Sequence, residues 1–520
     1  MQQHLFEYKC ISMAESTPLL SQPTDSDSSL TEPPPLLLSE KHLPSLASTV
    51  EKCIGEFTWS QFLQAVLVSF AWVFDAQQTF ISVFTDAQPS LNCTEKDDHV
   101  SSGRASIISE WGLECENSFV TSLPASLFFL GCLVGGIVLA TLADSSLGRK
   151  NMLLFSCLFM SLSSLLAAFS INIWVYSLFK FLCGFARATI GTSALVLTSE
   201  LVGNRWRGQI SVVGFFCFTI GFLSLPAMAY ANRNSSWRNL YMWTSIPAIF
   251  YCVIVKFFVR ESPRWLLVKG RKEEAAETLK CISSITQSNV NLAVNGIFPS
   301  NVDPDLTMNN TDLYCALKIL LQKKWSSRRL WTVMASGFGI GLVYYGMPLG
   351  LGNLSFNLYL SVTLNALSEL PSSLLTFLLI DKFKRRNALL VFTVVSGVFS
   401  VLSSIEGKVW SQMEIWFELI SFFSACTAFN VYLIYTTELF PTCVRNSALS
   451  MARQALVLGG SISPVVVGEG RKNKFVCYGV FGLVICCSGV FGVFLPETRG
   501  RPLSDTMEDE ESKGRSATLA

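Results

Sequence analysis

Among the ionisable residues inside long apolar runs of the sequence, five are candidates for function: Asp75, Lys180, Arg187, Glu369 and Arg453. On insertion scales, an ionisable side chain within the hydrocarbon of a bilayer costs at least about 2.5 to 3.5 kcal/mol, so such residues usually face a protein interior or a water-filled cavity. Residues of this kind commonly mark the pathway of a substrate or an ion. The chemistry they predict is therefore the binding and movement of a charged solute.

Glu369 is the main candidate for binding a cationic substrate. A carboxylate in a low-dielectric cavity attracts an ammonium group, and the aromatic faces of Tyr344 and Tyr345 can add cation–π stabilisation. The alternative is a structural role, in which Glu369 partners Arg453 or an amide freed by Pro371. For each tyrosine taken alone, packing in the core is the competing interpretation.

Asp75 predicts either a substrate contact or a second function, the coupling of transport to an ion. If Asp75 pairs with Lys180, protonation of the carboxylate would release the base, because burial and a paired charge set the pKa of such a group. A static ion pair is the alternative. Arg187 lies seven residues beyond Lys180, about two helical turns, and therefore shares its helical face. Arg187 is thus the other possible partner of Asp75.

These residues need membrane-spanning helices to position them. The chain is 50% hydrophobic and only 15% charged, which is too apolar for a soluble protein of 520 residues. A bilayer-spanning helix needs about 20 predominantly apolar residues. Twelve segments qualify, and they predict an all-α membrane protein surrounded by the lipid bilayer. They lie near residues 60–84, 119–143, 151–170, 173–197, 209–231, 239–259, 330–350, 355–380, 387–405, 413–437, 446–468 and 474–495.

Composition also excludes several classes of function. The formal net charge is +1, so nothing indicates a nucleic-acid partner. The three histidines, His4, His42 and His99, lie outside the apolar runs, which leaves no histidine cluster for an intramembrane metal. Because no nucleophile–base or metal constellation appears, we expect neither a cofactor nor an enzyme.

Charged landmarks recur along the chain at a nearly constant offset. Asp144 returns as Asp381, the Glu-Leu-(five)-Arg pattern that starts at Glu200 returns at Glu438, and Glu261 returns as Glu497. The repeat predicts two homologous six-helix halves, 59–260 and 329–497, related by an axis along the membrane normal. Acidic and basic residues from both halves can then form ion pairs when a cytosolic gate closes and separate when it opens. The alternative for each motif alone is that its basic residues only set the orientation in the membrane. The predicted gating residues are Asp144, Gly148, Arg149, Glu200, Arg207, Asp381, Arg385, Glu438 and Arg445.

The Lys and Arg residues of the short loops place both termini in the cytosol. The loop with Arg471, Lys472 and Lys474 is the exception, because it is basic although this topology places it outside the cytosol. This topology makes 1–58 a disordered cytosolic tail, 86–118 an extracytosolic loop, 261–328 a cytosolic linker and 498–520 a cytosolic tail. Sequons at Asn92, Asn234 and Asn353 then predict extracytosolic glycosylation, and Cys93 and Cys115 either form a disulfide or stay reduced.

Several motifs together resemble one family. They are Gly148-Arg149-Lys150, Glu261-Ser262-Pro263-Arg264-Trp265, Glu438-Leu439-Phe440-Pro441-Thr442-Cys443-Val444-Arg445 and Pro496-Glu497-Thr498-Arg499-Gly500. They are similar to signatures of the organic cation and carnitine transporter family, and Phe74-Asp75-Ala76-Gln77-Gln78-Thr79-Phe80 is similar to its plant branch. The resemblance covers about residues 50 to 505. It implies a major facilitator fold, alternating access, a small organic cation or zwitterion such as carnitine, choline or a polyamine as substrate, and a proton or sodium as coupling ion.

One position bears on the charge of the substrate. Val457 stands where animal cation carriers of this family have Asp and where carriers of anions or zwitterions have Arg. Arg453 lies one turn earlier and can reach the same face. A cationic lining there favours a zwitterion that carries a carboxylate, such as carnitine.

Three other interpretations stay open. A proton-coupled sugar or other nutrient carrier is the alternative transporter, because Glu261-Ser262-Pro263-Arg264 also occurs in sugar porters. A receptor without transport would have lost the gating residues, which are present. Glu15-Ser16-Thr17-Pro18-Leu19-Leu20 fits an acidic dileucine sorting signal and points to the vacuolar membrane, with the plasma membrane as the alternative.

Overall fold

The computed structural model of the 520-residue chain describes residues 54–87, 106–143, 147–283, 313–354, 356–379, 382–405, 413–441, 443–499 and 504, 507, 508, 510 and 511. The predicted site residues Asn92, Cys93, Asp144 and Asp381 lie outside this part of the chain. Within it the regular structure is helical, and eleven helical segments are long and apolar enough to cross a membrane.

The first half contains six membrane-length segments. The first is built from three consecutive helices and the fourth from two, with short breaks between them. The segments are α3 (Trp59–Ser69), α4 (Ala71–Phe80) and α5 (Ser82–Thr85); α7 (Ser118–Ala143); α8 (Arg149–Ala167); α9 (Ile173–Arg187) and α10 (Ile190–Leu201); α11 (Arg207–Ala231); and α12 (Trp237–Phe258).

The second half repeats this arrangement with α17 (Lys324–Gly350), α18 (Leu358–Leu379), α19 (Arg385–Leu402), α20 (Glu414–Leu439), α21 (Arg445–Gly470) and α22 (Lys474–Val493). Of these six, α18 is the one that is not among the eleven spans. It is a 22-residue helix that carries Asn365, Glu369 and Pro371, and it packs against α20 and α11. Its length of 22 residues is that of a membrane-spanning helix.

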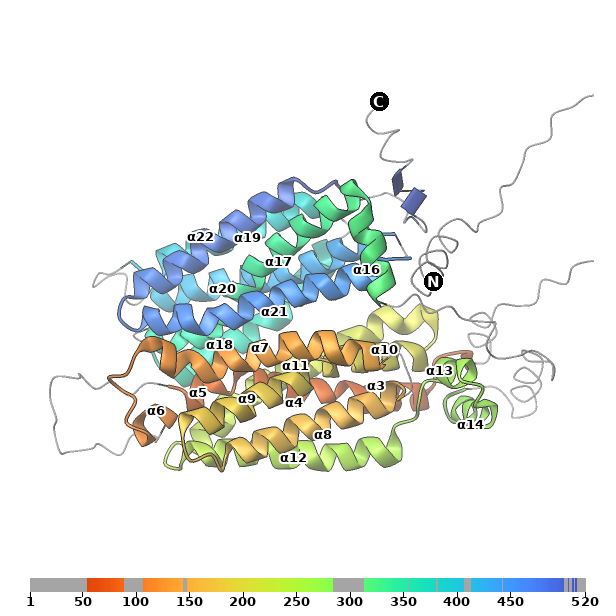
Figure 1. The fold of residues 1–520 in the computed structure, drawn as a ribbon, viewed down its shortest axis with the longest axis horizontal. Coiled ribbons are helices and arrows are strands. Elements are labelled where there is room, and N and C mark those ends of the chain that lie inside the picture. Colours follow the sequence, from red (N-terminus) through yellow and green to blue (C-terminus); the bar gives the residue numbers. More distant parts are fainter. Residues whose placement is uncertain are drawn as a thin grey trace, which may run out of the picture.

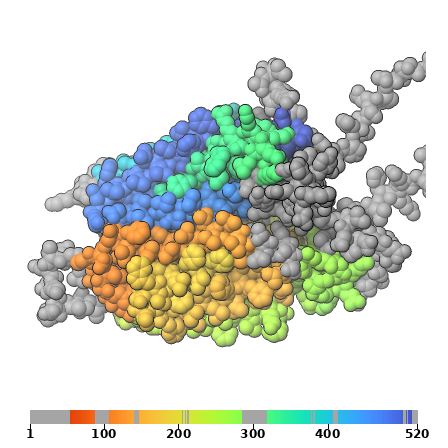
Figure 2. All heavy atoms as spheres, in the orientation of Figure 1, coloured from red at the N-terminus to blue at the C-terminus, as the bar shows by residue number. Residues whose placement is uncertain are grey.

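The two halves form two stacked layers. In Figure 1 the helices of the first half, orange to yellow-green, lie below those of the second half, green to blue. Figure 2 shows the two layers meeting along a boundary across the visible face. Large apolar side chains such as Phe257 and Leu483 are exposed on the outer surface. In a membrane protein such a surface faces lipid.

Short helices mark the two ends of the bundle. The end that carries α13 (Pro263–Val268), α14 (Lys272–Ile282) and α16 (Leu313–Gln322) is called the linker end here, and the opposite end, with α6 (Ile107–Glu110), the α6 end (Figure 1). Polar caps fix several helix starts, because a side-chain oxygen accepts a bond from an otherwise unpaired N–H group. Thr58, Asn172 and Asn473 act in this way on α3, α9 and α22.

The repeated glutamates have the same structural role in both halves. Glu261 Oε1 accepts hydrogen bonds at 3.0 Å from the backbone N–H groups of Arg149 and Lys150, at the start of α8. Glu497 accepts from Arg385 N at 2.9 Å, at the start of α19. A carboxylate is favourable there because helix N-termini carry partial positive charge. Arg149 and Glu261 recur as Arg385 and Glu497 at one and the same offset along the chain, so the sequence repeat is also a repeat of contacts.

Candidate functional site

A cavity of about 440 Å³ lies between the two layers. Its walls come from α3, α4, α7, α9, α10 and α11 of the first half and from α17, α18, α20 and α21 of the second. The structure brings all five predicted substrate-binding residues to this cavity, and these are Asp75, Tyr344, Tyr345, Glu369 and Arg453. Pockets of about 300 to 1,000 Å³ suit small organic ligands.

Glu369 is hydrogen-bonded at one oxygen, and its other oxygen is buried without a hydrogen bond among the described residues. Tyr344 donates a hydrogen bond to Glu369 Oε1 at 2.6 Å, and within the described residues Oε2 has no hydrogen-bond donor. Tyr344 is itself stacked on Phe429 with ring centroids 4.4 Å apart, and it meets Tyr345 edge-on at 5.0 Å. The carboxylate therefore sits beside aromatic rings, and one of its buried oxygens lacks a hydrogen bond that a ligand could supply once it reaches this wall.

Arg453 is the complementary charge on the same cavity. It lines the wall from α21, and among the described residues it makes neither a hydrogen bond nor an ion pair. In particular, no ion pair joins it to Glu369, so the structural alternative considered for Glu369 is not seen. The site therefore presents one acid and one base that do not neutralise each other.

Asp75 pairs with Arg187. Arg187 Nε lies 2.9 Å from Asp75 Oδ1, and Arg187 Nη2 donates to Oδ2 at 3.1 Å. This two-point contact shows that the predicted alternative partner is right and that the Asp75–Lys180 pair is wrong. The reason is the height of the residues in the bundle. Asp75 lies near the middle of the segment Trp59–Thr85 and Arg187 near the middle of Ile173–Leu201, whereas Lys180 lies nearer the start of that segment.

Lys180 lies instead in a buried polar cluster nearer the α6 end. Its ammonium is 4.7 Å from the ring centroid of Phe128 and 5.7 Å from that of Tyr241. Tyr176 donates to Asp86 Oδ1 at 3.1 Å and lies 2.6 Å from the hydroxyl of Tyr241. The sequence interpretation missed Asp86 because it assigned this residue to the loop, whereas the side chain is buried.

Three of the predicted gating residues at the linker end, Arg385, Glu438 and Arg445, have contacts within their own half. Arg385 Nε lies 3.1 Å from Glu438 Oε2, and Arg445 Nε donates to the Phe440 carbonyl at 3.3 Å. Glu200 lies in the last turn of α10, and Arg207 begins α11. The cavity lining extends to Asn446, next to the start of α21, so the cavity reaches this end of the bundle.

Gly148 is required by its surroundings. Its φ is 83°, in the left-handed region that favours glycine. A Cβ atom at this position would collide with the Glu261 carboxylate that caps α8. The glycine of this motif therefore serves the capping contact.

The α6 end is closed by contacts between the two halves. Arg471 donates to Thr121 Oγ1 at 3.0 Å and to the backbone oxygen of Asp86 at 3.3 Å. Tyr359 stacks on Phe84, with ring centroids 5.8 Å apart. None of these residues lines the cavity, so the molecule is closed at the α6 end and open toward the linker end. The contacts of Arg471 therefore come from the basic loop that is the exception to the topology rule.

The glycosylation and disulfide predictions are only partly within the described residues. Asn234 lies in the exposed turn after α11. Asn353 donates its side-chain amide to the Val467 carbonyl at 3.0 Å, which argues against a sugar on that nitrogen. Cys115 is exposed, and its predicted partner lies outside the described part of the chain.

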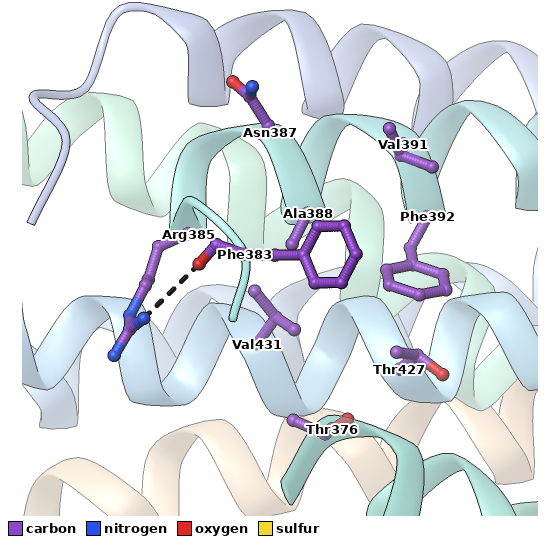
Figure 3. A pocket seen from close by; sticks show the side chains of 9 residues that line it. All are labelled: Thr376, Phe383, Arg385, Asn387, Ala388, Val391, Phe392, Thr427 and Val431. Carbon is purple, nitrogen blue, oxygen red and sulfur yellow. Dashed lines mark hydrogen bonds between the residues drawn. The ribbon is translucent and has the colours of Figure 1, made fainter. Parts of the chain in front are cut away.

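A second, smaller cavity of about 260 Å³ lies within the second half alone (Figure 3). Its walls are mainly apolar side chains such as Val391, Phe392 and Val431. Arg385 donates to the Phe383 carbonyl at 3.4 Å beside it. This cavity does not lie between the halves, so the central cavity is the candidate site.

Two stacked six-helix layers around a cavity that opens at one end define a transporter of the major facilitator class. Residues 72–509 match the family model described as "Sugar (and other) transporter". Among solved structures, the inward-open xylose transporter from E. coli matches with a TM-score of 0.63 and 18% identity, over 87% of this chain and 98% of the other. At this identity the likeness establishes the fold.

Curated relatives are much closer in sequence. The chain is 58% identical to "Organic cation/carnitine transporter 3" of Arabidopsis thaliana, over 96% of this chain and 98% of that protein. It is 54% identical to "Organic cation/carnitine transporter 2" of the same plant, over 98% and 99%. The chain belongs to the organic cation/carnitine transporter family. The predicted family, fold class and transporter function are thereby confirmed.

Proposed function

We propose that this transporter carries a small organic zwitterion with an ammonium group and a carboxylate, such as carnitine. The observation behind the proposal is that Glu369 and Arg453 line one cavity and that no ion pair joins them in the described part of the chain. A buried charge without a partner is unfavourable, so each favours a ligand group of opposite sign. The names of the relatives support the same class of substrate.

The ammonium group would bind at Glu369. Glu369 Oε2 has no hydrogen-bond donor among the described residues, and the stacked rings of Tyr344 and Phe429 lie beside this carboxylate. Quaternary ammonium groups bind well against aromatic faces because the ring quadrupole attracts the cation. The carboxylate of the substrate would bind at Arg453, whose planar guanidinium can donate two parallel hydrogen bonds.

Asp75 and Arg187 are best explained as a static ion pair in the cavity wall. Their two-point geometry neutralises both charges, so neither needs the substrate as a partner. Under this interpretation Asp75 shapes the cavity without contacting the charged groups of the substrate. Coupling to a proton or to sodium would then require another group.

A sugar or other nutrient is the second candidate substrate. The cavity wall carries the amide side chains of Asn430, Asn446 and Gln454, which could hydrogen-bond hydroxyl groups. Uptake measured in oocytes for carnitine, choline, tetraethylammonium, polyamines and hexoses at two pH values separates the two candidates. We expect saturable carnitine uptake, and uptake of hexose alone would overturn the proposal.

We also propose that the linker end and both termini face the cytosol and that the protein lies in the vacuolar or the plasma membrane. The basic residues of the loops at the linker end support this orientation. A fluorescent fusion with and without the dileucine pair Leu19-Leu20 distinguishes the two membranes.

A further inference from the structure

Glu418 is a fully buried carboxyl group outside the substrate cavity. It lies on α20, one turn after Glu414, and its side chain has no exposed surface. Asn365 of α18 donates to Glu418 Oε1 at 3.0 Å. Among the described residues, Glu418 Oε2 and Asn365 Oδ1 have no hydrogen-bond partner, and neither residue lines the cavity.

Among the described residues, the charged and titratable groups around Glu418 offer it no cation. On α20 itself, Glu414 is already paired with Lys474 of α22 at 3.2 Å. Tyr478 of α22 is near enough to interact electrostatically with Glu418, but its hydroxyl donates to the Gly350 carbonyl at 3.1 Å. The α19 helix has no ionisable residue after Arg386.

The remaining neighbouring helices also leave Glu418 without a positive partner. Cys426 of α20 interacts electrostatically with both Glu418 and Glu369. On α17, the hydroxyl of Tyr344 is committed to Glu369. On α21, Arg453 lies at the cavity wall and Glu469 pairs with Lys472. An ionised carboxylate in this place would be buried without a counter-charge, which is unfavourable, so the group takes up a proton instead.

A protonated Glu418 matches Asn365 at both positions. A neutral carboxyl has one donor and one acceptor, and so does the face of a side-chain amide. The proton on Oε2 would supply the donor that Asn365 Oδ1 lacks, while Oε1 keeps the bond from Asn365 Nδ2. We propose that Glu418 and Asn365 form the proton-binding site that couples transport to a pH gradient.

The proton-binding site lies on the same helix as a residue of the substrate cavity. Asn365 and Glu369 are four residues apart on α18 and therefore lie on one face, a turn from each other. Loss of the proton leaves two acceptors without a donor between α18 and α20, which weakens the contact between these helices. Because α18 also carries Glu369, its movement changes the cavity. Proton release and substrate release would then occur together.

This inference rests on the proposed function, since coupling needs a transported substrate. The experiment uses the full chain in proteoliposomes, with carnitine as the probe, and compares uptake driven by an acid outer pH with exchange at equal pH. We expect acid stimulation of at least five-fold in the unaltered protein. Glu418→Gln should lose this stimulation, with exchange persisting at a reduced rate, because exchange does not require proton release.

The control is Glu414→Gln, one turn away in the same helix, which should keep its pH stimulation. If Glu418→Gln fails to reach the membrane, Glu418→Asp decides, because it keeps the carboxyl and should shift the midpoint of the pH profile. The same stimulation in Glu418→Gln, an unshifted midpoint in Glu418→Asp, or uptake that depends on sodium and not on pH would overturn the inference. Absence of carnitine exchange in the unaltered protein would instead overturn the proposed function.

Discussion

Arg471 crosses from the second half of the chain to donate a hydrogen bond to Thr121 of the first half at 3.0 Å. The same guanidinium donates to the Asp86 carbonyl, so one side chain holds two segments of the opposite half. This contact and the aromatic pair of Phe84 and Tyr359 close the α6 end while the cavity extends to the linker end. Alternating access requires such contacts to break when the cavity opens on the other side.

Arg471→Gln should therefore favour opening at the α6 end. Hydrogen bonds to a charged group contribute about 1.5 to 3 kcal/mol, so their loss should shift the equilibrium about ten-fold or more. A cysteine at Ser122, with Cys93 and Cys115 replaced by serine, reports the opening through its labelling rate with a membrane-impermeant maleimide. Lys472→Gln is the control, because Lys472 is exposed and its one ion pair within the described residues is with Glu469 in its own turn. Equal labelling in both variants would contradict the role of Arg471.

Glu369→Gln should weaken binding of every substrate with an ammonium group. The variant keeps the shape of the side chain and removes the charge that attracts the cation. We expect apparent affinities for carnitine and choline to fall by about ten-fold or more, which corresponds to about 1.4 kcal/mol or more. Competition uptake measures this directly. Unchanged affinities for both compounds would remove Glu369 from the binding site.

Arg453→Gln should separate zwitterions from simple cations. Carnitine carries a carboxylate that Arg453 would bind, whereas choline has none, so carnitine affinity should fall about ten-fold while choline affinity stays within about two-fold. Arg453→Lys keeps the charge but not the planar two-point geometry of the guanidinium. Its affinity for carnitine should therefore lie between that of the unaltered protein and that of Arg453→Gln. An equal loss for carnitine and choline would show that Arg453 acts on folding or on gating.

Asp75→Asn should destabilise the protein, because it leaves Arg187 buried without a counter-charge. Removing one partner of a buried ion pair costs about 3 to 5 kcal/mol. The double variant Asp75→Asn with Arg187→Gln removes both charges and should recover part of that loss, as read from melting temperatures in detergent. If the double variant is as unstable as the sum of the single variants, the two residues are not coupled.

The positive φ angle of Gly148 allows a matched comparison. Gly148→Ala places a Cβ atom against the Glu261 carboxylate, whereas Gly270→Ala, also at positive φ, meets nothing within 4 Å. Backbone strain in the left-handed region costs about 1 to 2 kcal/mol in each variant. Gly148→Ala should lower the melting temperature further, because it also disturbs the capping of α8. Equal melting temperatures would show that the cap contributes little.

The architecture was predictable from the sequence because its signals are local or repeated. Apolar runs located the membrane segments, and the nearly constant offset between the charged landmarks identified the two halves. Glu369 was identified because an acid in an apolar run is rare.

The pairings were harder to predict, because they depend on the relative height of antiparallel helices. Asp75 could pair with Lys180 or Arg187, and only the packed structure decides between bases two turns apart on one face. Asp86 and Glu418 were missed for a similar reason. Each lies close to the end of an apolar run, where sequence alone does not distinguish a solvated acid from a buried one.

The glutamate caps have a consequence for the synthesis of the protein. The first half closes on itself once the ribosome has made Glu261, because this residue returns to the start of α8. The second half has to wait for Glu497, near the end of the chain, before α19 gains its cap. Domains completed early generally fold first during translation. A premature stop shortly before Glu497 should therefore spare the first layer and leave the second unfinished, as a target for quality control in the endoplasmic reticulum.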